Sequence, residues 1–293
     1  MTHKAGYVNI VGNPNVGKST LSNKLIGEKL SIITAKAQTT RHRIFGIVNA
    51  DDYQIVFSDT PGVLQPHYKL QESMLKFSKA ALADADVLLY ITDMVETYDK
   101  NNEFLTLVKE SKAPILLVIN KIDLAKQDEL DQKFDFWKNE LPQAEIFPVS
   151  AQHGFNVQNL MNRIVELMPE SPPYFEKDAL TDRPERFFIT EIIREKILNY
   201  YQKEIPYSVE IEIEEFNDGP ARADIRAVIH VTRETQKGII IGHQGKALKK
   251  VGTEARKDIE KFIGKKVFLE LYVKVSKDWR DKEGMLRQFG YDL

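Results

Sequence analysis

The sequence contains no cysteine among its 293 residues. A chain without cysteine forms no disulfide bond, thiolate zinc site, iron–sulfur cluster or thiol nucleophile, so those kinds of structure and chemistry are excluded. Long apolar runs are missing too: the longest, Val87–Ile91 and Ile115–Ile119, fall far short of the ~18 residues that a membrane-spanning helix needs. The first residues contain no apolar signal-peptide core. We therefore expect a soluble protein of the reducing cytoplasm.

The length and the distribution of charge point to two domains with different surfaces. A chain near this length exceeds the size at which one hydrophobic core usually keeps growing. The whole chain is nearly neutral, with 41 basic and 43 acidic residues, but residues 233–282 carry 14 basic and 7 acidic side chains. A local excess of positive charge attracts a polyanion. The alternative is a helical face that is simply solvated.

Short apolar segments alternate with helical patterns along residues 1–170. The apolar segments lack a polar alternation, which is typical of parallel strands covered on both faces. They are Tyr7–Val11, Tyr53–Ser58, Val87–Thr92, Ile115–Asn120 and Glu145–Pro148. Arg43–Ala50 is predicted to be a strand antiparallel to Tyr53–Ser58, because only two residues separate them. Helices are predicted at Leu21–Ile26, Leu70–Leu82, Asn101–Glu110, Glu129–Leu141 and Val157–Met168. The alternation predicts a doubly wound α/β domain with a mostly parallel sheet.

A different order of elements begins after a proline-rich stretch. Four prolines between positions 169 and 184 exclude a helix there and predict a linker at residues 171–185. Residues 186–293 are then predicted to form a small α+β domain with a three-stranded sheet. Its predicted elements are the helix Phe187–Gln202, the strands Ser208–Phe216 and Arg222–Val231, the helices Thr235–Ile241 and Lys246–Ile263, and the strand Lys266–Val275.

The segment from Gly12 to Ser19 reads GNPNVGKS and matches the phosphate-loop pattern GxxxxGK[ST]. It lies between a predicted strand and a predicted helix, where backbone N–H groups can surround phosphate oxygens. Lys18 would reach the β- and γ-phosphates and the Ser19 hydroxyl would bind Mg²⁺. A glycine-rich turn that matches by chance is the alternative. The residues predicted to bind nucleotide here are Gly12, Asn13, Pro14, Asn15, Val16, Gly17, Lys18, Ser19 and Thr20.

Three further motifs follow predicted strands, at the sheet edge where an open α/β domain binds its ligand. In the first, DTPG at residues 59–62, the Asp59 carboxylate would support the metal. In the second, NKID at residues 120–123, the Asp123 carboxylate would accept hydrogen bonds from guanine N1–H and its amino group, which adenine lacks. In the third, backbone N–H groups at Ser150 and Ala151 would meet guanine O6. The nucleotide-binding residues predicted from these motifs are Asp59, Thr60, Pro61, Gly62, Val63, Asn120, Lys121, Asp123, Ser150 and Ala151.

These motifs together resemble the GTPases of the translation-factor-related class. By that similarity Thr40, in the loop over residues 28–42, would reach Mg²⁺ and the γ-phosphate, with Thr39 as the second candidate and a loop without that role as the alternative. Val63 stands where many small GTPases carry the glutamine that orients water, so slow hydrolysis is expected. We predict a catalytic group of Lys18, Thr40 and Gly62, and a Mg²⁺ group of Ser19, Thr40 and Asp59.

The second domain carries the signature IGxxG of a KH domain. Such a loop joins two helices and clamps about four nucleotides of single-stranded RNA. The predicted RNA contacts are Ile241, Gly242, His243, Gln244, Gly245, Lys246, Lys249 and Lys250. The alternative is a structural turn with a solvated basic face. Trp279, Phe268 and Tyr272 are candidates either for stacking on bases or for the core. The histidines do not cluster, so no transition-metal site is expected.

The order of these motifs resembles the bacterial Era family of GTPases, from about residue 5 to about residue 290, including QTTR at residues 38–41. The resemblance implies a Mg²⁺-dependent GTPase whose type II KH domain binds the 3′ end of 16S ribosomal RNA and which assists assembly of the small (30S) ribosomal subunit. It also implies peripheral association with the inner face of the cell membrane, for which the sequence offers no lipidation motif and no basic amphipathic anchor. We expect a monomer.

Two other functions compete with this interpretation. An ATP-using phosphate-loop enzyme, such as a kinase, would not need Asp123, so Asp123→Asn should abolish guanine preference only if the chain is a GTPase. A passive RNA-binding protein with a vestigial nucleotide fold would not need Lys18, Ser19 and Asp59, all of which are intact.

Overall fold

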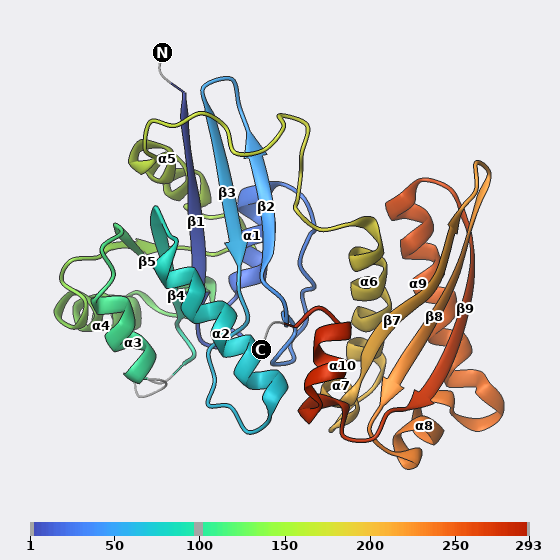
Figure 1. Ribbon diagram of the computed structural model, residues 1–293. Coiled ribbons are helices and arrows are strands. Elements are labelled where there is room, and N and C mark those ends of the chain that lie inside the picture. The colour runs from blue at the N-terminus through green and yellow to red at the C-terminus, as the bar shows by residue number, and fades with distance from the viewer. Residues whose placement is uncertain (1–2, 97–101, 292–293) are drawn as a thin grey trace. The chain divides into compact units, whose positions relative to one another are not determined.

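The computed structural model describes residues 3–96 and 102–291. The chain divides into two compact units (Figure 1). The first unit comprises residues 1–67 and 71–182, and the second comprises residues 68–70 and 183–293.

The first unit is built on a six-stranded sheet with the order β2-β3-β1-β4-β5-β6. The strands are β1 Lys4–Gly12, β2 Ile44–Asn49, β3 Tyr53–Asp59, β4 Val87–Asp93, β5 Ile115–Asn120 and β6 Glu145–Pro148. Only β2 is antiparallel to its neighbour, and the remaining pairs are parallel. The predicted mostly parallel, doubly wound sheet is therefore confirmed.

Helices cover both faces of this sheet, which is why its strands show no polar alternation. The helices are α1 Lys18–Ile26, α2 Lys69–Ala83, α3 Asn102–Lys109, α4 Gln127–Glu140 and α5 Val157–Leu167, and η1 Ile122–Leu124 is a short 3₁₀ turn. Helices α1 and α5 pack on one face and α2, α3 and α4 on the other. All seven residues of β4 are buried between them. The predicted helix at residues 101–110 begins one residue outside the described part of the chain.

Residues 170–182, which we call the strap, are attached to the first unit. The backbone N–H of Ile47 donates to the Leu180 carbonyl (2.8 Å), and Gly46 pairs with Thr181 in an antiparallel bridge. The buried Gln54 side chain accepts hydrogen bonds from the N–H groups of Tyr174 and Phe175 (2.7 and 2.9 Å). The sequence predicted a linker at residues 171–185. In the structure residues 174 and 175 are held by Gln54 of β3, residues 179–182 contact β2, and the division between the units falls after residue 182. Prolines exclude a helix, yet they leave an extended chain free to pair with a sheet edge.

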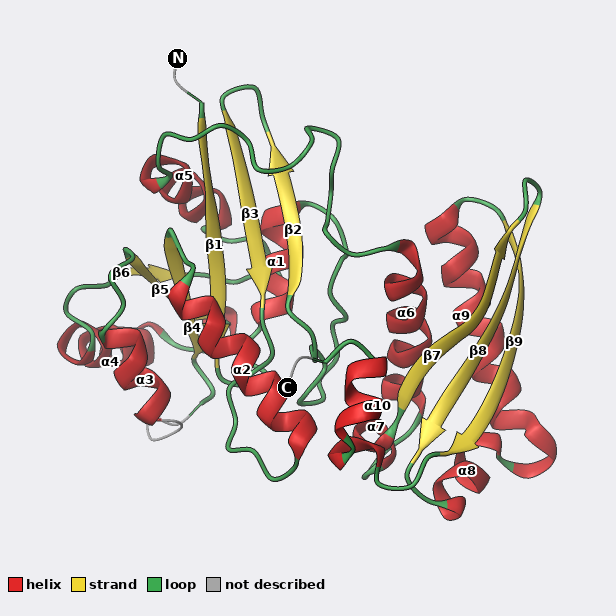
Figure 2. Ribbon diagram, in the orientation of Figure 1, coloured by secondary structure: helices red, strands yellow, loops and turns green. Residues whose placement is uncertain are grey.

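The second unit contains a three-stranded sheet with the order β7-β8-β9 (Figure 2). Its strands are β7 Glu210–Asp218, β8 Arg222–Val231 and β9 Lys266–Val275, and its helices are α6 Glu185–Tyr200, α7 Ile205–Ser208, α8 Glu234–Ile241, α9 Lys246–Ile263 and α10 Glu283–Gln288, with 3₁₀ turns η2 His243–Gly245 and η3 Trp279–Asp281. Strands β7 and β8 are antiparallel, whereas β8 and β9 are parallel. Helices α6, α8 and α9 contribute to the core on one face of the sheet. The short helices α7 and α10 were not expected from the sequence.

Candidate nucleotide site and nucleic-acid interface

The phosphate loop runs from the end of β1 to the start of α1, as its sequence predicts. Gly17 precedes the helix with φ of 96°, and a Cβ atom there would lie 2.2 Å from Asn120 Nδ2. Only glycine fits both the left-handed backbone and the contact with Asn120. The loop leads directly into the N-terminus of α1, and a glycine-rich loop that opens a helix in this way is an anion-binding arrangement.

Lys18 is buried within this loop, and its Nζ donates to the Asn13 carbonyl (2.8 Å). Burial lowers the pKa of Lys18 to about 8, while the charges of Asp59 and Glu96 act in the opposite direction. Desolvation disfavours the ammonium form, so the side chain gains from any anion that approaches it. A phosphate group supplies that anion.

Three oxygen-bearing side chains converge beside the loop. Ser19 Oγ donates to Asp59 Oδ2 (2.7 Å) and lies 2.8 Å from Thr40 Oγ1. The second carboxylate oxygen of Asp59, Oδ1, is buried and accepts no hydrogen bond from any described residue. Burial also raises the pKa of Asp59, against the effect of the surrounding hydroxyl groups and Lys18. A carboxylate oxygen left without a donor among hydroxyl groups fits a bound Mg²⁺, which prefers oxygen ligands.

The structure distinguishes between the two threonines of the loop at residues 28–42. Thr40 is buried, and its hydroxyl lies beside the Ser19 hydroxyl and the Asp59 carboxylate. Thr39 instead donates to the Lys36 carbonyl (2.6 Å) and contacts Thr34 within its own loop. Of the two threonines, Thr40 is therefore the one that lies beside Ser19 and Asp59.

The guanine motifs lie at the carboxyl ends of β5 and β6 and are tied to the phosphate loop. Asn120 Nδ2 donates to the Val16 carbonyl (2.8 Å), and Asn120 Oδ1 accepts from the Ala151 N–H (3.0 Å). Lys121 Nζ donates to the Asn15 carbonyl. Asp123 is exposed and accepts a hydrogen bond from Ser150 Oγ. The structure thus brings the predicted phosphate and guanine residues together in one site.

Residues 60–63 contribute backbone rather than side chains. The Thr60 hydroxyl is buried and donates to the Ile10 carbonyl (2.6 Å), and the Pro61 carbonyl accepts from Ser78 Oγ (2.9 Å). Gly62 lies against Pro14, where an added Cβ would be 2.7 Å from Pro14 Cα. Val63 donates its N–H to the Gly12 carbonyl and packs its side chain into the core. No side chain in this stretch is placed to orient water.

Two acidic residues that sequence analysis missed lie at the end of β4 and just beyond it. Asp93 forms an ion pair with Lys121 (2.6 Å), and the Glu96 carboxylate accepts a hydrogen bond from Asn13 Nδ2 (2.8 Å). The position of Asp93 at the carboxyl end of a parallel strand was a usable signal. Glu96 lies in the following loop, where its sequence position alone does not indicate a contact with residue 13.

The predicted KH loop joins α8 to α9 through a single 3₁₀ turn. Gly242 has φ of 70°, and a Cβ atom there would lie 2.6 Å from Ala247 Cβ. His243 and Gln244 are exposed at the tip of the loop, and Gln244 also has a positive φ. Ile241 and Gly245 are half-buried, whereas Lys246, Lys249 and Lys250 are exposed. The Lys250 ammonium lies 4.3 Å from the centre of the Tyr200 ring.

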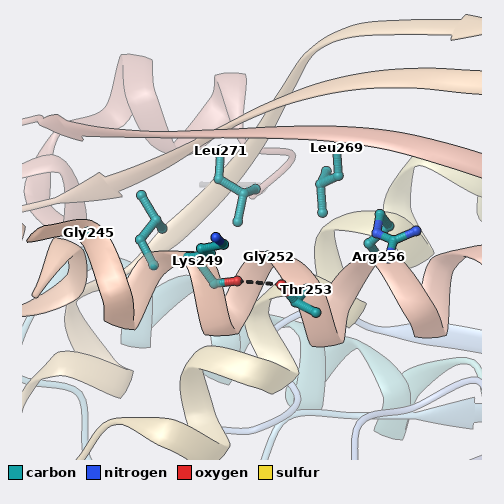
Figure 3. A pocket seen from close by; sticks show the side chains of 8 residues that line it. Gly245, Lys249, Gly252, Thr253, Arg256, Leu269 and Leu271 are labelled. Carbon is teal, nitrogen blue, oxygen red and sulfur yellow. Dashed lines mark hydrogen bonds between the residues drawn. The ribbon is translucent and has the colours of Figure 1, made fainter.

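A cavity of about 350 Å³ opens between α9 and β9 next to this loop. Figure 3 shows its lining, with leucines on the β9 side facing α9 and basic residues along the helix. It is lined by Gly245, Leu248, Lys249, Gly252, Thr253, Arg256, Leu269 and Leu271. An apolar floor with a basic rim suits bases and phosphates of a single strand. Sequence analysis did not find the leucines of this floor.

The aromatic candidates separate into two groups. Trp279 is fully buried and its Nε1 donates to the Ser208 carbonyl (3.0 Å), which is a core role. Phe268 and Tyr272 are about half exposed, with the guanidinium groups of Arg222 and Arg226 over their rings. Among the described residues no cluster of three or more His, Cys, Asp or Glu is arranged to hold a metal ion.

Comparison with protein families gives two matches, one in each unit. A family of GTPases described as 50S ribosome-binding matches residues 7–121, and the KH domain family matches residues 204–280.

Two solved structures resemble the chain over nearly its whole length. One is Era in complex with MgGDPNP and nucleotides 1506–1542 of 16S ribosomal RNA, with 41% identity and a TM-score of 0.95, covering 99% of this chain and 100% of that chain. The other is a variant of Era from Aquifex aeolicus bound to GDP·AlF₄⁻, with 41% identity, a TM-score of 0.94 and the same coverage.

Proposed function

Because this chain belongs to the Era family of GTPases, we propose that it assists assembly of the small ribosomal subunit by binding the 3′ end of 16S ribosomal RNA. It is a Mg²⁺-dependent GTPase with a KH domain. The name of the matching GTPase family refers to the 50S subunit, but that match covers residues 7–121 alone. The relative that matches the whole chain holds 16S RNA, which belongs to the small subunit, so the small subunit is the better-supported partner.

Different residues of the nucleotide site bind different parts of GTP. Lys18 and the loop N–H groups hold the phosphates, and Asp123 selects guanine. Mg²⁺ would be held by Ser19, Thr40 and Asp59, where it neutralises charge on the phosphates. The buried side chain of Val63 offers water neither a donor nor an acceptor. Intrinsic hydrolysis is therefore slow, and a turnover of tens per second without any partner would contradict this.

The groove between α9 and β9 carries the RNA-binding part of the proposal. The exposed glycine loop borders it, its floor is apolar, and Lys249 and Arg256 line its helical side. Bases stack on or pack against apolar surface, while basic side chains neutralise phosphates. The same arrangement would be unnecessary for a purely structural turn between two helices.

A charge reversal on α9 tests this proposal with a matched control. Lys249→Glu places a carboxylate in the groove, whereas Lys261→Glu makes the same change in the last turn of the same helix, outside the groove. Binding of an RNA with the sequence of nucleotides 1506–1542 of this organism's 16S RNA is measured by fluorescence anisotropy at two salt concentrations. We expect Lys249→Glu to weaken binding about tenfold or more and to lower the salt slope by about one. Equal affinity of both variants would refute the groove as the RNA site.

We also propose that the bound nucleotide controls RNA binding through the strap. The loop that holds Thr40 continues directly into β2, and β2 pairs with the strap at Leu180 and Thr181, just before the second unit resumes at residue 183. Ordering of such loops by a γ-phosphate is the usual switch of GTPases. RNA affinity measured with GDP and with a non-hydrolysable GTP analogue tests the coupling, and equal affinities would contradict it.

We propose the cytoplasm as the location of the protein, with peripheral association at the inner face of the cell membrane, on the ground of family membership. Within the described residues no helix has the length and apolar character needed to cross a membrane. Cell fractionation followed by a salt wash tests the proposal, because a peripheral protein is released by salt.

A further inference from the structure

The turn that follows β4 holds Glu96 in one orientation. The Asp93 carboxylate accepts hydrogen bonds from the backbone N–H groups of Val95 and Glu96 (2.9 and 2.8 Å). Thr92 donates its hydroxyl to the Glu96 carboxylate, and Lys133 Nζ donates to the Glu96 carbonyl (2.8 Å). Both the backbone and the side chain of Glu96 are thus fixed by neighbours in the sheet and in α4.

From this position Glu96 contacts the phosphate loop. Its Oε2 accepts a hydrogen bond from the side-chain amide of Asn13 (2.8 Å). The backbone carbonyl of the same asparagine accepts the hydrogen bond from Lys18. Asn13 is buried, so its amide is shielded from water at this contact. One residue therefore connects the Glu96 carboxylate to the lysine that binds phosphate.

We propose that Glu96 is a positioning residue for nucleotide binding, which acts by holding Asn13 and thereby the phosphate loop and Lys18 in their binding geometry. A site that is ordered before the ligand arrives loses less conformational entropy on binding. The negative charge of Glu96 cannot itself favour a phosphate, because like charges repel. Its contribution must come from the hydrogen bond, which an uncharged acceptor of the same shape can also make.

The substitution pair Glu96→Ala and Glu96→Gln separates these two effects. A glutamine at this position can accept from Asn13 through its carbonyl oxygen and donate to Thr92 through its amide nitrogen. We expect Glu96→Ala to raise the Kd for both GDP and GTP about tenfold, since it removes the hydrogen bond that holds the Asn13 side chain. Glu96→Gln should stay within about twofold of the unchanged protein, because the hydrogen bond is kept. Titration with fluorescent GDP and GTP analogues gives both constants.

Three further measurements distinguish positioning from general loss of structure. Glu110→Ala removes an exposed carboxylate just after the end of α3 and should change neither constant. The rate of hydrolysis at saturating GTP should change less than about twofold in Glu96→Ala, because bound nucleotide orders the phosphate loop without the hydrogen bond between Asn13 and Glu96. Thermal unfolding of each variant without nucleotide shows whether it is folded.

A double-mutant cycle with Asn13→Ala tests the route of the effect. If Glu96 acts through Asn13, adding Glu96→Ala to Asn13→Ala should raise the Kd no further. Asn13→Ala by itself should raise the Kd about as much as Glu96→Ala, and this comparison remains informative if Glu96→Ala folds poorly. Three results would overturn the proposal: a Kd for Glu96→Ala equal to that of the unchanged protein, a Glu96→Gln variant as weak as Glu96→Ala, or fully additive effects with Asn13→Ala.

Discussion

At the scale of single residues, the candidate nucleotide site contains buried groups whose charged forms are disfavoured by burial. Lys18 and Asp59 are both buried. Burial lowers the pKa of Lys18 and raises the pKa of Asp59, so it favours the neutral form of each. Each charge is therefore stabilised when a nucleotide phosphate or a metal ion joins it. In the proposed function, this burial is the reason that one lysine and one aspartate, which would be ordinary on a surface, favour a highly charged ligand.

The lowered pKa of Lys18 predicts a pH dependence of GTP binding. The ammonium form binds phosphate, and the pKa of about 8 in the protein without nucleotide means that this form is lost as the pH rises through 8. We expect the Kd for GTP to rise about fourfold between pH 7 and pH 8.5 and protons to be taken up on binding. Calorimetry in buffers of different ionisation enthalpy measures both. In Lys18→Arg, whose guanidinium does not titrate there, the dependence should disappear even if affinity is lower.

The lowered pKa of Lys18 affects folding stability and GTP affinity in opposite directions as the pH rises. The pKa of Lys18 is lower in the folded chain than in the unfolded one, so unfolded protein binds more protons between pH 8 and the ordinary lysine pKa. The contribution of this residue to stability therefore increases with pH across that interval, while GTP affinity falls. Lys18 thus serves binding at the expense of folding stability below pH 8.

At the scale of elements, the strap is a connection whose first part belongs to the sheet. Gln54 on β3 is its main attachment, because one side chain meets two backbone N–H groups and also donates to the Phe175 carbonyl (2.8 Å). The pairing of Gly46 and Ile47 with the strap covers the outer edge of β2. An edge strand covered in this way does not pair with other chains.

Replacing Gln54 should release the strap from the sheet without unfolding the first unit. We expect Gln54→Ala to speed hydrogen exchange of the amides in residues 174–182 at least tenfold and to lower the free energy of unfolding by about 2 kcal/mol, because buried backbone groups lose their partners. Mass spectrometry of exchanged peptides measures the first effect. Gln143→Ala, which removes an exposed glutamine side chain, is the matched control and should leave the strap protected. Unchanged exchange in Gln54→Ala would show that the strap is held by other contacts.

At the scale of the whole molecule, the chain contains separate hydrophobic cores for its two units. The first unit has one core on each face of its sheet, and the second has a single core between its sheet and helices. Each unit also has a ligand of its own in the proposed function. A ligand that binds only a folded unit stabilises that unit by mass action.

Two ligands should therefore shift two different unfolding transitions. We expect scanning calorimetry of the full chain to give two transitions, with GDP and Mg²⁺ raising the midpoint of one and the 16S RNA fragment raising the other. At a ligand concentration of 100 Kd the stabilisation is about 2.7 kcal/mol, which is easily measured. A single transition that both ligands shift equally would contradict independent cores.

The sequence predicted most of the elements because their signals are local. Strand β8, helix α9 and strand β9 have the bounds expected from the pattern of apolar residues. The phosphate loop and the guanine motifs were found because their chemistry requires given residue types at given spacings. Strand β7 begins two residues later than predicted, since residues 205–208 form a helical turn that apolar periodicity does not reveal.

What the sequence determined by itself was therefore the order of the two folds and the identity of the nucleotide, whereas the loop expected to contact RNA stays a prediction. Only the tertiary structure decided that Glu96 contacts Asn13, that Thr40 rather than Thr39 meets Asp59, that Trp279 is a core residue and that the end of the strap pairs with β2. The physical reason is the range of the interactions. A motif is a short stretch read directly along the chain, whereas each of these contacts joins residues whose distance in space depends on how the sheet and its helices pack.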